Sequence, residues 1–523
     1  MEIPLIQKNA TNTESEARLY DLCLKTFLRM WCYPSPYRHD AKELCDVLVV
    51  FGNHVILFSD KHSITSEFHK VNNIGLDWTR WYKKYVYESA KQLSGAYNYL
   101  KENNAVFLDA TKRQSLPHTY EPDQMIIHCI VVAHGIKKAC MQYFSGGSGS
   151  LIINTNLHND EHMCTRMDGQ PKNWNYPHRA SIPAGDFEYA KEFEHAFEIG
   201  IVNIKECFCH VLDDVSFELL LNQLDTISDF VEYIQKRERL FRERIIRADG
   251  EEDLLASYLR TYNDYQRHDF VFPEASRIYL PEGYWNYHTQ SQEYASKISA
   301  DRISYQWDNL IDSFYMTFND LQNHSNSVEI SKFEIATRIM ASPNRVDRRL
   351  LAKFFLKNRY DACIGNAPRI KVIPLNKNRC IFVFLAWQPG DTEYQQYRKE
   401  RKGLLEAYCC VSQLKFPNSH DVIGIAIESV NCPSESLDLM HLDTSKWGKE
   451  EYAVAEKIQN EYDFLRNPTE NYTEEYEYPP QKDIIVPDNH FSYKFAQQMK
   501  GKSRNSPCAC GSGKKAKKCC LLV

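Results

Sequence analysis

Four cysteine side chains lie within the thirteen residues from Cys508 to Cys520, close enough along the chain to bind one metal ion together. Cys508 and Cys510 are separated from Cys519 and Cys520 by a Gly-Ser-Gly turn and a lysine-rich run. Four thiolates suit the tetrahedral coordination of Zn²⁺, and a turn between two pairs lets them converge without a hydrophobic core. The spacing therefore predicts a structural zinc module, with a disordered, redox-labile basic tail as the alternative.

A second set of reactive side chains flanks two strand-like runs near the N-terminus. Residues 44–51 and 55–58 are apolar, and Gly52-Asn53-His54 between them is typical of a tight turn. Asp46 enters the first run and Lys61 follows the second, so a hairpin puts both at neighbouring strand ends. A carboxylate there can hold hydrated Mg²⁺ or Mn²⁺, while a lysine orients a water and offsets charge on a phosphate. The pattern favours phosphodiester hydrolysis, and ordinary solvated strand ends are the alternative.

A metal-dependent site of this kind needs a second carboxylate near Asp46. Glu43 and Asp60 lie beside the hairpin, and Glu14 and Glu16 on the preceding helical segment are further alternatives. Strict alternation points Asp60 to the opposite face of its strand unless a bulge intervenes. The predicted catalytic residues are Asp46, Lys61, Glu43 and Asp60, with Asp46 as the magnesium ligand.

The order of a helix, this hairpin and a second helix, with Asp46 and Lys61 at the strand ends, resembles the core of the PD-(D/E)xK nucleases. This restriction-endonuclease-like superfamily implies a metal-dependent nuclease acting on DNA or RNA. Its second carboxylate lies two residues before the lysine, where this sequence has Ser59. That departure supports the alternative of a non-catalytic interaction protein with a degenerate nuclease-like core.

Basic residues follow on the next helical segment, at residues 77–99. They are interleaved with aromatic residues, a composition that favours a local phosphate-binding patch. Lys91, followed by Gln92, resembles the lysine- and glutamine-bearing helix that supports nuclease sites of the superfamily. The predicted nucleic-acid-binding residues are Arg80, Lys83, Lys84 and Lys91.

The terminal pattern Cys-x-Cys-Gly-Ser-Gly-Lys-Lys resembles the SEC-C motif over residues 503–521. This small zinc module ends the Sec preprotein-translocation ATPase and many otherwise unrelated bacterial proteins. The fourth ligand here is Cys520, where the translocase form has histidine. The resemblance implies a docking module for a protein partner or the ribosome, and a nuclease core joined to such a module resembles bacterial defence proteins.

Composition limits the remaining alternatives. The chain has 523 residues, of which 43% are apolar and 25% charged, as expected for a folded protein of several domains. The formal charge of −6 confines any contact with nucleic acid to local patches. We expect no secretory signal, no membrane span and therefore no membrane partner, and a cytoplasmic protein whose other thirteen cysteines are reduced thiols.

The spacing of apolar residues predicts a helix over 14–31 with Thr13 as its N-cap, one helix over 217–241, and a helix over 393–414 that connects two strands. Helical and strand-like segments thus alternate along the chain, which predicts a mixed α/β fold. We expect a nuclease-like α/β domain at 1–165, a mainly helical region at 166–328, a second α/β domain at 329–465, a linker at 466–502 and the zinc module at 503–523. Two further clusters favour structural roles, namely His158 with His162, and Cys207 with Cys209. The basic stretch 345–359 suits either nucleic acid or solvent.

Overall fold

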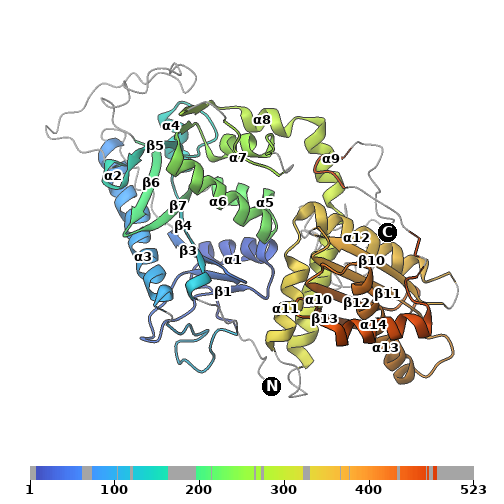
Figure 1. Ribbon diagram of the computed structural model, residues 1–523. Coiled ribbons are helices and arrows are strands. Elements are labelled where there is room, and N and C mark those ends of the chain that lie inside the picture. Colours follow the sequence, from blue (N-terminus) through green and yellow to red (C-terminus); the bar gives the residue numbers. More distant parts are fainter. Residues whose placement is uncertain are drawn as a thin grey trace. The chain divides into compact units, whose positions relative to one another are not determined.

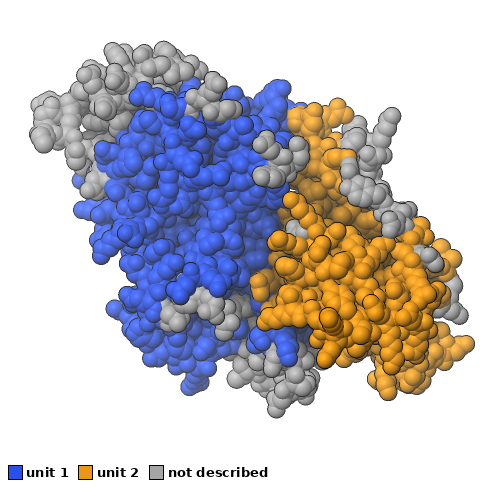
Figure 2. Space-filling view, viewed as in Figure 1, with its two compact units in different colours: residues 1–290, 315–334 blue, residues 291–314, 335–523 orange. Residues whose placement is uncertain are grey.

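The structure is a computed structural model whose chain forms two compact units, residues 1–290 with 315–334 and residues 291–314 with 335–523 (Figures 1 and 2). Both units combine helices with a β-sheet, so the predicted mixed α/β class is confirmed. The predicted zinc ligands Cys508, Cys510, Cys519 and Cys520 lie outside the described residues. The structure describes residues 8–61, 74–102, 104–117, 122–162, 196–213, 215–263, 267–272, 276–321, 330–364, 367–375, 377–432, 436–466, 468–469 and 475–479.

The first unit is built on a nine-stranded sheet with the order β1-β2-β3-β4-β7-β6-β5-β8-β9. β2 and β3 form the predicted antiparallel hairpin, with Val47 opposite Phe58, and β3, β4 and β7 run parallel. The carboxyl ends of these three strands therefore meet at one edge of the sheet, beside the start of β2. The strands are β1 Cys32–Pro34, β2 Val47–Phe51, β3 His54–Lys61, β4 Ile126–Ala133, β5 Ile152–His158, β6 Glu198–Ile204, β7 Cys207–Asp213, β8 Ile245–Ala248 and β9 Arg277–Leu280.

Helices cover both faces of this sheet (Figure 1). On one face Phe27 of α1 packs between Phe58 of β3 and Phe230 of α6, with ring centroids 6.2 Å and 5.2 Å apart, respectively. On the other face α3 packs against β3, β4, β6 and β7. The helices are α1 Glu14–Phe27, α2 Ile74–Trp81, a π-helical segment Tyr82–Tyr87, α3 Glu88–Lys101, α4 Lys137–Tyr143, α5 Ser216–Gln223, α6 Ile227–Glu243, α7 Glu251–Leu259 and α8 Tyr284–Thr289, with short 3₁₀ turns at Pro122–Gln124 and Asn159–His162.

The second unit contains a four-stranded sheet with the order β10-β11-β12-β13. β11 and β12 are parallel and connected by α13, while both outer strands pair antiparallel. The strands are β10 Arg369–Leu375, β11 Cys380–Ala386, β12 Asp421–Ile427 and β13 Leu437–Asp443. The helices are α9 Gln292–Asp301, α10 Tyr305–Leu321, α11 Ile330–Ala341, α12 Arg345–Asp361, α13 Tyr394–Lys415 and α14 Lys449–Tyr462, and the division between the units falls within α10 and α11.

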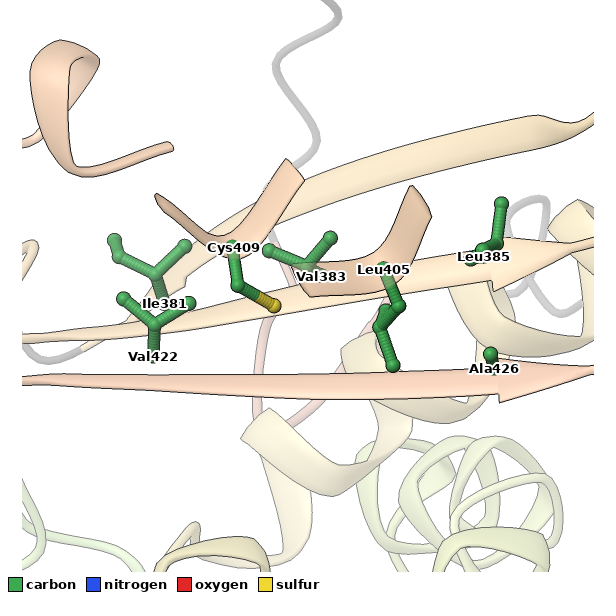
Figure 3. Packing of buried hydrophobic residues seen from close by; sticks show 7 residues of the cluster. All are labelled: Ile381, Val383, Leu385, Leu405, Cys409, Val422 and Ala426. Carbon is green, nitrogen blue, oxygen red and sulfur yellow. The ribbon is translucent and has the colours of Figure 1, made fainter. Parts of the chain in front are cut away.

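A close-packed layer joins α13 to the small sheet. Leu405 and Cys409 of α13 lie over β11 and β12 in a cluster whose members are at most 1% exposed (Figure 3). A Cβ atom at Gly424 of β12 would lie 2.6 Å from the sulfur of Cys409, so only glycine allows this approach. The packing explains why the predicted crossover helix connects these two strands. The strand members of the cluster are Ile381, Val383, Leu385, Val422 and Ala426.

The arginines that begin the basic stretch at residues 345–359 face neither nucleic acid nor solvent, which corrects the expectation for that part of the stretch, while Lys357 is exposed. Arg345 and Arg348 each lie 2.7 Å from a carboxylate oxygen of Asp308, and Arg349 lies 2.6 Å from Asp301. These three arginines are at most 4% exposed. Helical spacing cannot distinguish a solvated charged face from one paired with carboxylates of distant helices, because the partners are remote in sequence.

Candidate active site

Asp46 and Lys61 meet at the edge of the large sheet where β2 begins and β3 ends. The backbone N–H of Asp46 donates to the carbonyl of Phe58 at 3.0 Å, which continues the hairpin ladder beyond β2. The side chain of Asp46 accepts a hydrogen bond from the backbone N–H of Asp60 at 2.5 Å. The carboxylate is therefore held against the strand end that carries Lys61.

The charges around Asp46 leave its carboxylate poorly compensated. The pKa of Asp46 is raised to about 7. Burial is the main cause and repulsion by Glu43 and Glu16 adds to it, while the N–H of Asp60 and the ammonium of Lys61 oppose the rise. A carboxylate whose pKa is raised by burial next to a lysine is a frequent feature of functional sites. One lysine and three carboxylates thus influence one another at this edge.

Glu43 is exposed over much of its surface, yet its carboxylate belongs to the same group. Partial burial raises its pKa, as does repulsion by Glu16, whereas the Ser35 hydroxyl and Lys61 lower it. The predicted residues Asp46, Lys61 and Glu43 are therefore brought together.

Glu16 lies on the first turn of α1 and is only 8% exposed. Its backbone N–H donates to the hydroxyl of the N-cap residue Thr13 at 3.1 Å, and its carboxylate accepts from the N–H of Asn12 at 2.7 Å. Its negative charge raises the pKa of both Asp46 and Glu43, so it acts electrostatically on this edge of the sheet. Glu14, the other alternative on this helix, is exposed. The cap fixes which of the two glutamates faces the sheet edge.

Asp60 turns to the opposite face of β3, as strand alternation requires. Its carboxylate lies 2.6 Å from Nε2 of His134 and accepts a hydrogen bond from the hydroxyl of Ser15 on α1. The predicted catalytic residue Asp60 thus contributes its backbone N–H to Asp46, while its side chain belongs to a buried pair. The position before Lys61 that carries a carboxylate in the nuclease superfamily is Ser59, which is buried.

The predicted nucleic-acid-binding residues lie along α2, the π-helical segment and α3. Arg80, Lys83, Lys84 and Lys91 are all exposed. Lys91 lies 3.5 Å from Glu88, and the ammonium of Lys84 lies 4.9 Å from the ring centroid of Tyr85. Arg80 also has an acidic neighbour, since it lies 3.9 Å from Asp77.

The aromatic residues between these cations do not belong to the same surface. Trp81, Tyr82 and Tyr85 are at most 4% exposed, so they pack in the core and cannot stack on bases. The indole N–H of Trp81 donates to the carbonyl of His134 at 3.1 Å, which fixes the end of α2 near the end of β4. This corrects the expectation that aromatic side chains between the cations contact nucleic acid. The exposed surface of this helix offers only charged side chains.

The donor set suits a hydrated magnesium ion better than a metal enclosed by protein. Within the described residues there is no group of three or more His, Cys, Asp or Glu side chains that can hold a metal. Mg²⁺ needs less, because it usually keeps several waters and binds one or two carboxylates together with substrate phosphates.

The other sequence clusters have structural roles. His162 is buried and accepts a hydrogen bond from the N–H of Gly200 at 2.8 Å. The sulfur of Cys207 lies 3.3 Å from that of Cys129 and 3.9 Å from that of Cys209, all in the core. Sequence analysis did not identify His134, although a polar residue directly after a parallel strand marks the edge where sites usually form.

Comparison with known proteins identifies one motif. Residues 504–522 match the SEC-C motif, and this match includes all four cysteines of the terminal cluster. No curated protein and no solved structure matches the chain. Within the part of the chain that the structure describes, every helix is too short or too polar to span a bilayer.

Proposed function

We propose that the first unit hydrolyses phosphodiester bonds of DNA or RNA in a metal-dependent reaction. The observation that carries this proposal is the placement of Asp46 beside the end of β3, where Lys61 lies, with Glu16 and Glu43 acting on the same carboxylate electrostatically. The order of α1, the β2-β3 hairpin, α3 and a parallel β4 is consistent with the resemblance to the restriction-endonuclease-like superfamily. A role in bacterial defence, inside the cytoplasm, fits the same resemblance.

Each residue has a distinct task in the proposed site. Asp46 holds the metal, and Glu16 replaces the carboxylate that is missing at Ser59, because Glu16 is buried and its charge acts on Asp46. Lys61 orients the attacking water and stabilises negative charge on the phosphate. Glu43 lies further out and receives the proton of that water. A bound Mg²⁺ or Mn²⁺ supplies Lewis-acid polarisation of the phosphate.

Substrate binding is assigned to the exposed cations of the helix that follows β3. Arg80, Lys83 and Lys84 lie in the part of the helix that Trp81 anchors at His134, near the strand end that carries Lys61. Lys91 lies two turns further along. Contacts with phosphates are independent of base identity, so this surface favours binding without sequence specificity.

The test is cleavage of labelled single- and double-stranded DNA and RNA with Mg²⁺ or Mn²⁺. We expect Asp46→Ala and Lys61→Ala each to reduce the rate by at least about 1,000-fold, because each removes a group required in the transition state. Asp421→Ala and Lys357→Ala in the second unit are matched controls and retain the rate. The absence of cleavage of every polymer, or cleavage that survives both site substitutions, rejects the proposal.

We further propose that Cys508, Cys510, Cys519 and Cys520 bind one structural Zn²⁺ and that this module docks on a protein partner or the ribosome. The SEC-C match supports it, because this set of four thiols suits tetrahedral zinc. Metal analysis should find one zinc per chain, lost when residues 503–523 are deleted. Unchanged zinc in the truncated chain would place the metal elsewhere.

The second candidate function is that of a non-catalytic adaptor. Ser59, in place of the superfamily's carboxylate, favours it. An adaptor retains nucleic-acid binding through Arg80, Lys83, Lys84 and Lys91 without turnover. Binding that persists with no cleavage under any metal would support this candidate over the nuclease.

A further inference from the structure

His134 connects three separate parts of the candidate site. It follows β4 directly, and its backbone N–H donates to the carbonyl of Lys61 at 3.1 Å. Its Nε2 lies 2.6 Å from a carboxylate oxygen of Asp60, and its own carbonyl accepts from the indole of Trp81 at 3.1 Å. His134 thereby links the end of β3, the buried carboxylate of Asp60 and the helix that carries Arg80, Lys83 and Lys84, which we call the basic helix.

The contact with Asp60 continues to the proposed metal ligand. The backbone N–H of Asp60 donates to Asp46 at 2.5 Å, while its side chain is fixed by His134 and Ser15. The side chain of Asp60 is 1% exposed and that of His134 is 8% exposed, so the contact is shielded from solvent. The orientation of the N–H that holds Asp46 therefore depends on a pair on the other face of the strand.

We propose that His134 is a positioning residue of the nuclease site. It touches no reacting atom, and it acts by fixing the end of β3 so that the Asp60 N–H and Lys61 are held in place around Asp46. This inference rests on the proposed function. Groups behind a metal site that orient its ligands contribute about 10- to 100-fold to activity or metal affinity when they are mutated.

The histidine side chain at position 134 both fills space in the core and makes a polar contact. The ring packs edge-to-face on Phe217 of α5 at 5.4 Å between centroids, and Nε2 provides the polar contact with Asp60. Without that donor, the buried carboxylate of Asp60 keeps only the Ser15 hydroxyl, and a buried carboxylate short of partners shifts or takes up a proton. Glutamine retains a donor of similar reach, whereas alanine does not.

The first experiment compares cleavage by the wild-type chain, His134→Ala and His134→Gln. We expect His134→Ala to lower kcat by about 10- to 100-fold while KM stays within threefold, because the substrate-binding cations are unaffected. His134→Gln should recover most of kcat. His441→Ala is the matched control, since His441 forms a similar pair with Asp421 at 2.8 Å in the second unit, and it should change neither parameter.

The second experiment measures hydrogen exchange of the Asp60 amide in the same variants without substrate. His134→Ala should accelerate exchange at least tenfold, and His134→Gln and His441→Ala should not. An active wild type with unchanged kcat in His134→Ala, or unchanged exchange in that variant, overturns the inference while leaving the nuclease intact. A wild type that cleaves nothing rejects the proposed function itself, and the inference about His134 with it.

Discussion

Two carboxylates at the ends of strands, one in each unit, have opposite surroundings. Glu428 follows β12 and is fully buried, but its oxygens lie 2.9 Å from Nη1 of Arg401 and accept from the N–H of Ser436 at 2.7 Å. Asp46 precedes β2 and has one backbone donor, one nearby lysine and two repelling glutamates. The charge on Glu428 is neutralised within the fold, whereas the charge on Asp46 is not.

The contrast separates a carboxylate with a structural role from one to which we assign a role in the proposed site. A buried ion pair with all its hydrogen bonds made serves the fold, and its own partners leave no site for a ligand. A carboxylate kept near other carboxylates destabilises the native state, and such arrangements are typical of sites that bind a cation or transfer a proton. The neighbours of a carboxylate at a strand end therefore indicate whether its role is structural or functional.

The largest effect is expected from Arg401→Met in the second unit. The substitution leaves Glu428 without its cation, while Asp438 keeps Arg398, and removing one partner of a buried pair costs about 3–5 kcal/mol. Chemical denaturation, with hydrogen exchange of β12 peptides as the local probe, measures this loss. Arg398→Met is the control: this side chain contacts Asp438 but is 32% exposed, so its loss costs at most about 1 kcal/mol. Equal effects of the two substitutions would contradict a buried, neutralised pair.

Asp46→Asn, in contrast to Arg401→Met, is expected to raise the free energy of unfolding at high pH. The pKa of Asp46 is about 7 in the folded chain and near the usual value of 3.8 when unfolded, so the folded state binds the proton more tightly. Its contribution to stability is complete below pH 4 and is lost as the pH rises through 7. Asp46→Asn should therefore stabilise the protein at pH 8 by about 2–4 kcal/mol and leave it unchanged at pH 4.

Urea denaturation at both pH values measures this difference. Asp421→Asn is a suitable control, because Asp421 is paired with His441 in the second unit. A variant that is less stable than the wild type at pH 8 would show that the surroundings of Asp46 favour the charge.

A smaller effect is expected from Glu16→Gln. Glutamine still accepts from the N–H of Asn12, so α1 keeps its first turn while the site loses one negative charge. We expect the cleavage rate to fall by about 10- to 100-fold and the Mn²⁺ affinity to fall with it. Glu14 lies two residues before Glu16 on the same helix and is exposed. Glu14→Gln should therefore change the rate by less than twofold. If Glu43→Gln lowers Mn²⁺ affinity and Glu16→Gln does not, Glu43 is the second carboxylate.

Local signals in the sequence predicted the elements that form this site. The helix from residue 14 with its cap at Thr13, the turn at Gly52-Asn53-His54, and the crossover helix between β11 and β12 are all confirmed. Each depends on residues close together in the chain, where spacing and turn chemistry are decisive. The segment from Phe217 to Phe241 was predicted as one helix but is two, because Thr226 caps a new helix by accepting from the N–H of Asp229 at 3.1 Å.

Long-range contacts account for what the sequence did not reveal. His134 and Asp60 are 74 residues apart, and only the parallel pairing of β3 and β4 brings them together. Burial of Arg348 and Arg349 likewise depends on acids of α9 and α10. The catalytic and nucleic-acid-binding roles of the named residues stay predictions, because geometry alone does not show turnover.

The smallest effect is expected on the basic helix, for Lys83→Ala combined with Lys84→Ala. Both side chains are exposed, so their loss removes phosphate contacts without disturbing the core. The slope of log affinity against log salt should decrease by about 1–2, with KM raised a few-fold and kcat unchanged. Lys357→Ala, also exposed but in the second unit, should leave the slope unaltered. A fall in kcat at constant KM would instead assign these lysines to the reaction itself. Substrate binding and catalysis would then not be divided between the basic helix and the edge that carries Asp46.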